Sequence, residues 1–473
     1  MATGSTASSG TEGLDPQDPR EAAETATPPP VAGVAESADP SAVSDEVAHD
    51  PTRRAFFFQF GKQAASAVGQ VAGMADLVSR ASSDVAGELL GLGEPGSSDG
   101  RPAFTRSPGS TSPVVSAAAP AAEDTFRSAY RLTGDELVLL DQRGIPEAVD
   151  EVAAKRGSDV AYYLRLGVAR GGPVLAQLAA YGLALTAGER AEQPGDQRDV
   201  ELRRTQRALT EARPSVRLLA WSMQRMGAVL AGFGEGVPGE EVAVALRGEA
   251  DAIAADVGAW QAAIAAALVK ELPSPVGRPT AVLVHGDQGA LDGGFVGTGL
   301  SALRQLRDAG RELRVFVTEG RPFMDGARLA SWELRQAGID HSVVPDAAVA
   351  WLLDREPIDA ILISADWVAA NGDVSALVGS RGIARLAATM APTADGARPR
   401  LIVSGVSATL DPATPDGAAI PVEMRPARDL VAYLTDVPIR ASDALVPAGD
   451  VVPAADITTM VSENGVSTTG GAG

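Results

Sequence analysis

One carboxylate in this sequence has the surroundings that acid/base chemistry requires. Asp366 closes the almost wholly apolar run 360–365, so a strand there would carry the side chain to the edge of a buried sheet. Partial burial disfavours a charged carboxylate and raises its pKa toward neutrality, as in a general acid or base. An Asp after a strand can instead cap the next helix. The pattern alone leaves both interpretations of Asp366 open.

Polar side chains also follow two other apolar runs. His285 and Asp287 stand in a glycine-rich segment, 284–299, in which the backbone can approach a ligand closely and the next helix start favours an anion. The same segment could be an ordinary tight turn. Glu319 and Arg321 follow a second run. Arginine is a two-pronged donor suited to a phosphorylated or polyhydroxylated ligand, although the two side chains could also pair with each other.

Two arginines stand beside helix breaks. Arg170 precedes the pair Gly171-Gly172 and a proline, and Arg213 directly precedes another proline. Because Gly and Pro end or begin helices, each arginine should lie near a helix end. The sequence leaves open whether they are solvated or point into a cleft between domains.

These side chains need a scaffold that gathers several strand ends. Five short β-branched runs alternate with stretches of helical period in the second half of the chain. Such alternation indicates an α/β fold, a Rossmann-like parallel sheet covered by helices, whose crevice lies at the carboxyl ends of the strands. The predicted strands are 281–286, 313–320, 340–348, 359–367 and 400–407.

The rest of the chain divides into three parts. Residues 125–277 are rich in Ala and Leu with helical period, and predict a helical N-terminal domain before the Rossmann-like domain, 278–464. Residues 1–124 are dominated by small, polar and acidic residues and predict a mostly disordered extension, and 465–473 predict a disordered tail. The extension carries 17 acids and 7 bases, which is −10 of the chain's formal net charge of −21.

One segment of the extension is different. Residues 53–92 have apolar side chains at helical spacing and begin with several phenylalanines, which predicts an amphipathic helix that docks on this chain or on a protein partner. Arg53-Arg54 could instead open a twin-arginine export signal. Their distance from Met1 and the polar residues that follow disfavour export, so we expect a cytoplasmic protein.

Composition excludes several classes of function. The chain has no Cys, which removes disulfides, thiolate metal sites and a cysteine nucleophile, and its three His are too few for a His-rich metal centre. The acidic balance argues against nucleic-acid binding. No window has the 18 uninterrupted apolar residues of a spanning helix. We therefore expect no metal, no membrane span and no nucleic-acid partner.

Several segments together resemble a known family of isomerases. The stretches LDQRGIP, ARGGPVLAQLAAYGLAL and ARPSVRLLAWSMQRM, followed by the three strand-end segments in order, are similar to the 5-methylthioribose-1-phosphate isomerase family. Its superfamily also contains ribose-1,5-bisphosphate isomerase and the alpha, beta and delta regulatory subunits of translation initiation factor 2B. The resemblance runs collinearly from about Leu137 to about Glu423.

The resemblance implies a fold and a reaction. Members join a helical domain to a Rossmann-like domain, usually as homodimers, and convert a ribose 1-phosphate derivative into the ribulose 1-phosphate ketose, in methionine salvage, without a cofactor. A Cys and an Asp are their acid/base pair. By position, Asp366 matches the catalytic Asp, whereas Arg170, Gly171 and Arg213 match substrate-binding positions. Gly172 stands where the family has Ala.

The sequence departs from the family at the site itself. Gly286 occupies the position of the catalytic Cys, and Asp325 replaces a substrate-contacting Gln. Ala376 and Leu377 stand where the family has a substrate-binding Asn-Lys pair. Losing a proton-transfer partner typically costs a factor of about 10² to 10⁴ in rate. Asp287 or His285, at the same strand end, could supply a replacement proton carrier.

Three functions are compatible with this sequence. The first is an aldose-ketose isomerase with altered acid/base chemistry, which Asp366, Arg170 and Arg213 support. The second is a non-catalytic sensor of sugar phosphates or nucleotides, like the initiation-factor subunits, which the missing thiol and the docking helix support. The third is a different reaction on a related small molecule.

Overall fold

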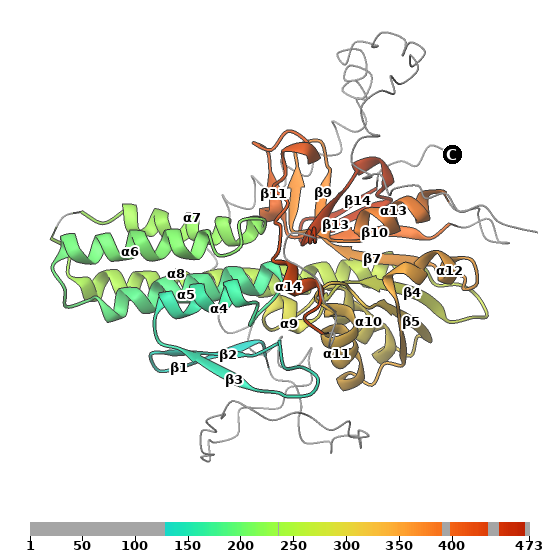
Figure 1. Cartoon of the computed structure of the whole chain (residues 1–473), viewed down its shortest axis with the longest axis horizontal. Coiled ribbons are helices and arrows are strands. Elements are labelled where there is room, and N and C mark those ends of the chain that lie inside the picture. Colours follow the sequence, from blue (N-terminus) through green and yellow to red (C-terminus); the bar gives the residue numbers. More distant parts are fainter. Residues whose placement is uncertain (1–127, 235, 390–397, 434–443, 469–473) are drawn as a thin grey trace, which may run out of the picture. The chain divides into compact units, whose positions relative to one another are not determined.

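The computed structural model describes residues 128–234, 236–389, 398–433 and 444–468 (Figure 1). The predicted extension, its amphipathic helix near 53–92 and the arginine pair at 53–54 lie outside the described residues. All the elements below belong to one compact unit, 51–473.

The first described elements are strands, which the prediction of a helical N-terminal domain over 125–277 did not include. β1 (Tyr130–Thr133), β2 (Glu136–Leu140) and β3 (Glu151–Ala154) form a three-stranded antiparallel sheet. A Gly-Asp turn joins β1 to β2, and Gly134 has the positive φ of 60° that such a tight turn requires. The hairpin signal is therefore present in the sequence, where the longer helical stretches that follow obscure it.

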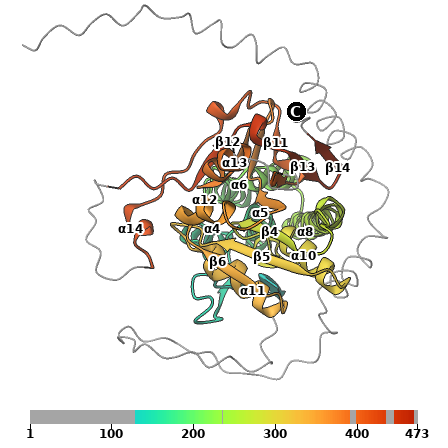
Figure 2. The same cartoon turned by 90° about the vertical axis from the view of Figure 1, so that its right-hand side faces the viewer.

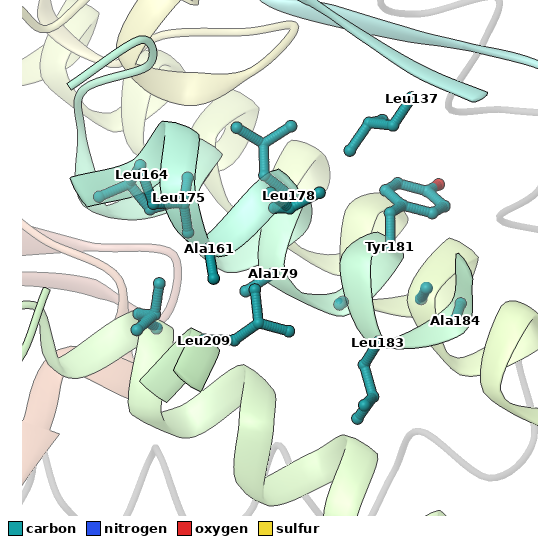
Figure 3. Close-up of a cluster of buried hydrophobic side chains, with 14 of the residues drawn as sticks. Leu137, Ala161, Leu164, Leu175, Leu178, Ala179, Tyr181, Leu183, Ala184 and Leu209 are labelled. Atoms are coloured by element: carbon teal, nitrogen blue, oxygen red, sulfur yellow. The ribbon is translucent and has the colours of Figure 1, made fainter. Parts of the chain in front are cut away.

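Five helices follow this sheet and confirm the helical part of the prediction. Alanine-rich α5 lies among the others, buried along almost its whole length, and packs against α4, α6, α7 and α8. Figure 3 shows leucine, alanine and tyrosine side chains of α4, α5, α6 and β2 converging in this core. The small side chains of α5 allow the neighbouring helices to pack closely against it. This packing holds α5 in place. The helices are α4 (Gly157–Leu166), α5 (Gly172–Glu189), α6 (Gly195–Thr210), α7 (Arg217–Ala231) and α8 (Gly239–Glu271).

Among the described residues, α8 alone is long and apolar enough to cross a membrane by length and composition. One such helix is weak evidence for a span. Its buried residues, including Leu246, Ile253 and Val257, recur every three or four positions as on a helix that packs on a core with one face. Alanines on the other face account for much of the high hydropathy.

The second part of the structure is a seven-stranded sheet, ordered β14-β13-β10-β7-β4-β5-β6. All neighbouring strands are parallel except the pair β13 and β14. The five predicted strands are confirmed, whereas β13 and β14 are additions. The predicted disordered tail is wrong for 465–468, because these residues form β14. The strands are β4 (Thr280–His285), β5 (Leu313–Thr318), β6 (His341–Val344), β7 (Ala360–Ser364), β10 (Arg400–Ser404), β13 (Thr459–Ser462) and β14 (Gly465–Thr468).

Helices cover both faces of this sheet, which explains its nearly uninterrupted apolar strands. One face packs against α8, α10 and α11, and the other against α12 and α13 (Figure 2). The chain runs outward from β4 through β5 and β6, returns to β7, and then runs outward on the other side. Parallel sheets bind ligands where the strand order reverses in this way, here between β4 and β7. The helices are α10 (Gly299–Asp308), α11 (Ser331–Gln336), α12 (Val349–Leu353) and α13 (Ser380–Thr389), with the single turns α9 (Ala290–Gly293) and α14 (Ala427–Leu430).

A small second sheet stands at the reversal point. Its strands are ordered β11 (Leu410–Asp411), β8 (Trp367–Ala369), β9 (Val374–Leu377) and β12 (Gly449–Val452). The pair Asn371-Gly372 lies in the turn from β8 into β9, and Gly372 has a positive φ of 88°. This sheet holds Asp366, the residue directly before β8, because the Asp366 backbone N–H donates to the carbonyl of Ser375 in β9.

Candidate active site

A cavity that is partly open to solvent lies beyond the carboxyl ends of β7 and β10. Its wall combines the start of α5 and residues of α7 and α8 from the helical part with strand ends of the sheet. The site therefore exists only because the two parts of the chain meet there. Its lining residues are Gly172, Pro173, Leu218, Gln261, Asp292, Thr298, Ser364, Ala365, Asp366, Ser404, Gly405, Val406 and Thr409.

Asp366 is the sequence-predicted catalytic residue that lines this cavity. Its backbone N–H donates to the carbonyl of Ser375 at 2.9 Å, and its carbonyl accepts from the N–H of Arg217 at 3.3 Å. The side chain does not cap a helix, because the element that follows is strand β8. Burial raises its pKa to about 6, although the positive charges of Arg213 and Arg170 act in the opposite direction. Near neutral pH this carboxyl can accept or release a proton.

The two glycines before α5 bring the backbone against two carboxyl groups. Gly171 has a φ of 106°, which glycine adopts without strain. A Cβ at Gly171 would lie 2.0 Å from Oδ1 of Asp292, and one at Gly172 would lie 3.4 Å from Oδ1 of Asp366. The first position therefore excludes any side chain, whereas the second would tolerate the alanine of the family.

Arg170 is held by an internal ion pair. Its Nε donates to Oδ2 of Asp325 at 2.8 Å, and its guanidinium stacks 3.7 Å from the ring centroid of Phe323. Its backbone N–H donates to the side chain of Gln142. The other carboxylate oxygen of Asp325 is buried and has no hydrogen-bond partner among the described residues. An unsatisfied buried carboxylate oxygen is costly, and a bound hydroxyl group would satisfy it.

Arg213 has a comparable partner. Its Nε donates to Oε2 of Glu423 at 3.0 Å, and the same carboxylate accepts from Arg425 at 2.7 Å. Burial raises the pKa of Glu423, but the two arginines outweigh burial and hold that pKa below its ordinary value. Burial also lowers the pKa of the Arg213 guanidinium. The cation that faces Asp366 is thus largely desolvated.

The two proposed replacement proton carriers do not line the cavity. His285 is buried, with Nδ1 2.8 Å from the Thr318 hydroxyl and Nε2 3.2 Å from the Val378 carbonyl, and burial lowers its pKa. Asp287 is hydrogen-bonded to Glu333. Burial and the negative charge of Glu333 raise the pKa of Asp287 well above its ordinary value. Both side chains have structural partners at the end of β4.

Glu319 and Arg321 do not pair with each other among the described residues, the alternative that the sequence left open. Glu319 accepts from the backbone N–H of Asp346 at 3.3 Å. Arg321 donates to the carbonyl of Leu430, the last residue of α14. Neither side chain lines the cavity. Ser404, also at a predicted strand end, does line it.

Gly286, which the sequence resemblance aligns with the family's thiol, lies beside an apolar side chain. Gly286 has a φ of 87°, and a Cβ there would lie 3.4 Å from Cδ2 of Leu377. By the sequence resemblance, Gly286 and Leu377 stand at the positions of the family's thiol and lysine. A side chain at Gly286 would therefore lie against Leu377.

Sequence reasoning missed one carboxylate that lines the cavity, Asp292. It belongs to the single turn α9 and its residue is 8% exposed. Burial raises its pKa well above the ordinary value, and the negative charge of Asp366 raises it further. The only sequence signal was an acid inside the glycine-rich segment 284–299, one turn beyond the residues at the strand end itself.

A match to the Initiation factor 2 subunit family spans residues 168–469, from the end of α4 to the end of the sheet. The chain belongs to this family. Among curated proteins, the methylthioribose-1-phosphate isomerase of Chloroflexus aurantiacus is 36% identical over 335 residues, 70% of this chain and 92% of the relative. The enzyme of that name from Anaeromyxobacter dehalogenans is 36% identical over 337 residues, with 70% and 91% covered.

Solved structures share the fold of this family member. The 5-methylthioribose 1-phosphate isomerase of Pyrococcus horikoshii has a TM-score of 0.62 and 23% identity, covering 74% of this chain and 94% of that one. The delta subunit of translation initiation factor eIF-2B from A. fulgidus has a TM-score of 0.59 and 24% identity, covering 73% and 97%. The α/β fold of a helical part followed by a Rossmann-like parallel sheet is thereby confirmed.

Proposed function

We propose that this protein is an aldose-ketose isomerase that acts on a ribose 1-phosphate derivative, of the kind that gives its curated relatives their name. The observation that carries the proposal is the place of Asp366. It lines the cavity at the reversal point of the sheet with a pKa raised to about 6. A carboxylate of this basicity can remove the proton from C2 of a sugar and return it to C1.

The arginines and glycines around the cavity would bind the phosphorylated sugar. Arg170 and Arg213 do not themselves line the cavity, but both act electrostatically on Asp366 and so lie near it. A phosphate oxygen can replace the carboxylate that each arginine now contacts, since guanidinium binds phosphate with the same two-pronged geometry. Gly171 and Gly172 would bring backbone close to the ligand. The isomerisation moves protons only, so it requires no redox cofactor.

Incubation with substrate tests this proposal directly. The purified full-length chain is mixed with 5-methylthioribose 1-phosphate or with ribose 1,5-bisphosphate, and the C2 carbonyl of a ketose product is followed by ¹³C NMR. We expect a ketose from one of them, and at least a hundredfold less from Asp366→Asn. Absence of product from both compounds would overturn the isomerase proposal.

One observation favours a second function, a sensor that binds without turnover. Both substrate-binding arginines are already paired with carboxylates, Arg170 with Asp325 and Arg213 with Glu423. A ligand must therefore displace a carboxylate from each. Calorimetry separates the two functions: heat of binding from the same compounds without any ketose supports the sensor, and turnover excludes it.

We also propose that the chain forms a homodimer in the cytoplasm, with a protein partner or its own body for the segment near 53–92. Sedimentation of the full chain and of a form that lacks residues 1–122 would give the mass of each. An unchanged dimer in the shortened form, together with loss of a captured protein, indicates docking on a partner. Export of the full chain by cells would exclude the cytoplasmic location.

A further inference from the structure

We propose that Asp292 is a second catalytic residue, the proton donor that works opposite Asp366 in place of the family's thiol. This inference rests on the proposed isomerase function and adds a residue to it. Asp292 and Asp366 both line the single cavity described above. They approach the backbone at successive positions, Asp292 at Gly171 and Asp366 at Gly172.

The two carboxyl groups have different surroundings. Asp366 faces the positive charges of Arg213 and Arg170 and the negative charge of Glu423. Asp292 faces carboxylates from other elements and no cation, and none of the described residues donates a hydrogen bond to its carboxyl oxygens. The cations favour the ionised form of Asp366, whereas negative neighbours favour the neutral form of Asp292. The carboxylates that act on Asp292 are Asp366, Glu333 and Asp325, and Asp287 lies within the same group.

Such a division gives one acid and one base in the same cavity, the arrangement that proton-transfer enzymes require. None of the described residues hydrogen-bonds to the Asp292 carboxyl, so this group remains available to a ligand in the cavity. Asp287 and Asp325 each have one carboxyl oxygen paired, with the N–H of Gly289 and with Arg170, and one oxygen without a partner among the described residues. Unlike Asp292, neither residue lines the cavity. His285 is engaged by Thr318 and Val378.

The proton balance closes with these two groups. Neutral Asp292 donates its proton to the ring oxygen of a furanose 1-phosphate as the bond from C1 to that oxygen breaks. Ionised Asp366 removes the proton from C2, and the freed electron pair forms the C1=C2 bond of an enol phosphate. Asp366 then returns its proton to C1, while ionised Asp292 takes the proton of the C2 hydroxyl as the C2 carbonyl forms. Both carboxyls regain their starting states, and the phosphate stays on O1.

Turnover by paired variants tests the assignment. We measure ketose formation by wild type, Asp292→Asn and Asp456→Asn. Asp456 is the matched control, another buried Asp, whose partner is Arg385 on the far side of the sheet. We expect Asp292→Asn to lose a factor of about 10² to 10⁴ in turnover, the usual contribution of a general acid, and Asp456→Asn to stay within threefold of wild type.

The pH profile distinguishes catalysis from a structural role. Turnover should rise as Asp366 ionises with a pKa of about 6 and should fall at higher pH as Asp292 loses its proton. Asp292→Asn should lose the alkaline fall while keeping the acid rise. If that variant does not fold, the wild-type profile decides, because a profile without an alkaline fall overturns the role of Asp292.

The outcomes distinguish failure of the role of Asp292 from failure of the proposed isomerase function. An active wild type with Asp292→Asn within threefold of it overturns the role of Asp292 and leaves the isomerase standing. Loss of turnover in Asp287→Asn, with Asp292→Asn unaffected, moves the role to Asp287 and overturns the inference. A wild type without turnover on either sugar phosphate overturns the isomerase, and the role of Asp292 with it.

Discussion

β7 and β4 lie side by side at the centre of the sheet. The residues that follow them differ in chemistry, because a carboxylate, Asp366, follows β7 and a glycine, Gly286, follows β4. Asp366 lines the cavity, at the position that the sequence resemblance matches to the family's catalytic Asp. Gly286 stands at the position that the resemblance matches to the family's thiol, and a side chain there would meet Leu377. A carboxyl group reappears one short turn later, in α9, where Asp292 lines the same cavity. Under the proposed function, one half of the acid/base pair keeps its place after β7, whereas the other differs from the family in both residue type and position.

Removing the carboxylate at the end of β7 should have the largest effect. Asp366→Asn keeps the size of the side chain and removes its ability to take a proton. We expect turnover to fall by a factor of about 10² to 10⁴, measured as initial rates of ketose formation. Unaltered turnover would show that Asp366 is not catalytic.

The buried carboxyls should also make stability depend on pH in an unusual direction. The pKa of Asp366 is raised from 3.8 to about 6, so the fold favours its protonated form. Its stabilising contribution is complete below about pH 4 and is lost as pH rises through about 6, a difference of about 3 kcal/mol. Urea unfolding of wild type between pH 5 and 8 should show a decline that Asp366→Asn reduces. An equal decline in both proteins would assign the effect to other groups, such as Glu333, whose pKa burial raises to about 7.

Much of the site around the end of β7 could be predicted from the sequence. The apolar run before Asp366 indicated a buried strand, and its position at the strand end indicated the crevice. The alternation of strands and helices gave the five central strands correctly. Periodicity and residue type suffice here because the features are local: one strand, its last residue and the turn that follows.

The part of the site around the end of β4 could not be predicted in the same way. Asp292 lines the cavity because a glycine from a segment more than a hundred residues earlier packs against it, and such a contact leaves no local pattern. Asp287 and His285 stood at the predicted strand end, but their partners, Glu333 and Thr318, come from other elements. Charge pairing between distant segments likewise made Asp325 the partner of Arg170. The sequence names the acids of this region without showing which of them faces the ligand.

Restoring the thiol at the end of β4 should not restore the family's chemistry. At a φ of 87° any side chain is strained, so Gly286→Cys should lose about 1 to 3 kcal/mol of unfolding free energy in urea. Leu377 would also lie against the new side chain. Gly286→Ala separates the backbone effect from the thiol, and we expect equal losses in both. A gain in turnover from Gly286→Cys alone would mean that the acid/base pair has not moved.

We expect the smallest effect from a change in the ion pair between Arg170 and Asp325. Asp325→Asn removes a negative charge from the place where a phosphate would lie, while leaving an oxygen for the Nε of Arg170. We expect 5-methylthioribose 1-phosphate to bind about tenfold more tightly by calorimetry, which corresponds to about 1.4 kcal/mol. Asp308→Asn, which removes the same charge from the exposed end of α10, is the matched control and should leave affinity unchanged. Weaker binding by Asp325→Asn would mean that this carboxylate itself contacts the ligand, accepting a sugar hydroxyl with its unpaired oxygen.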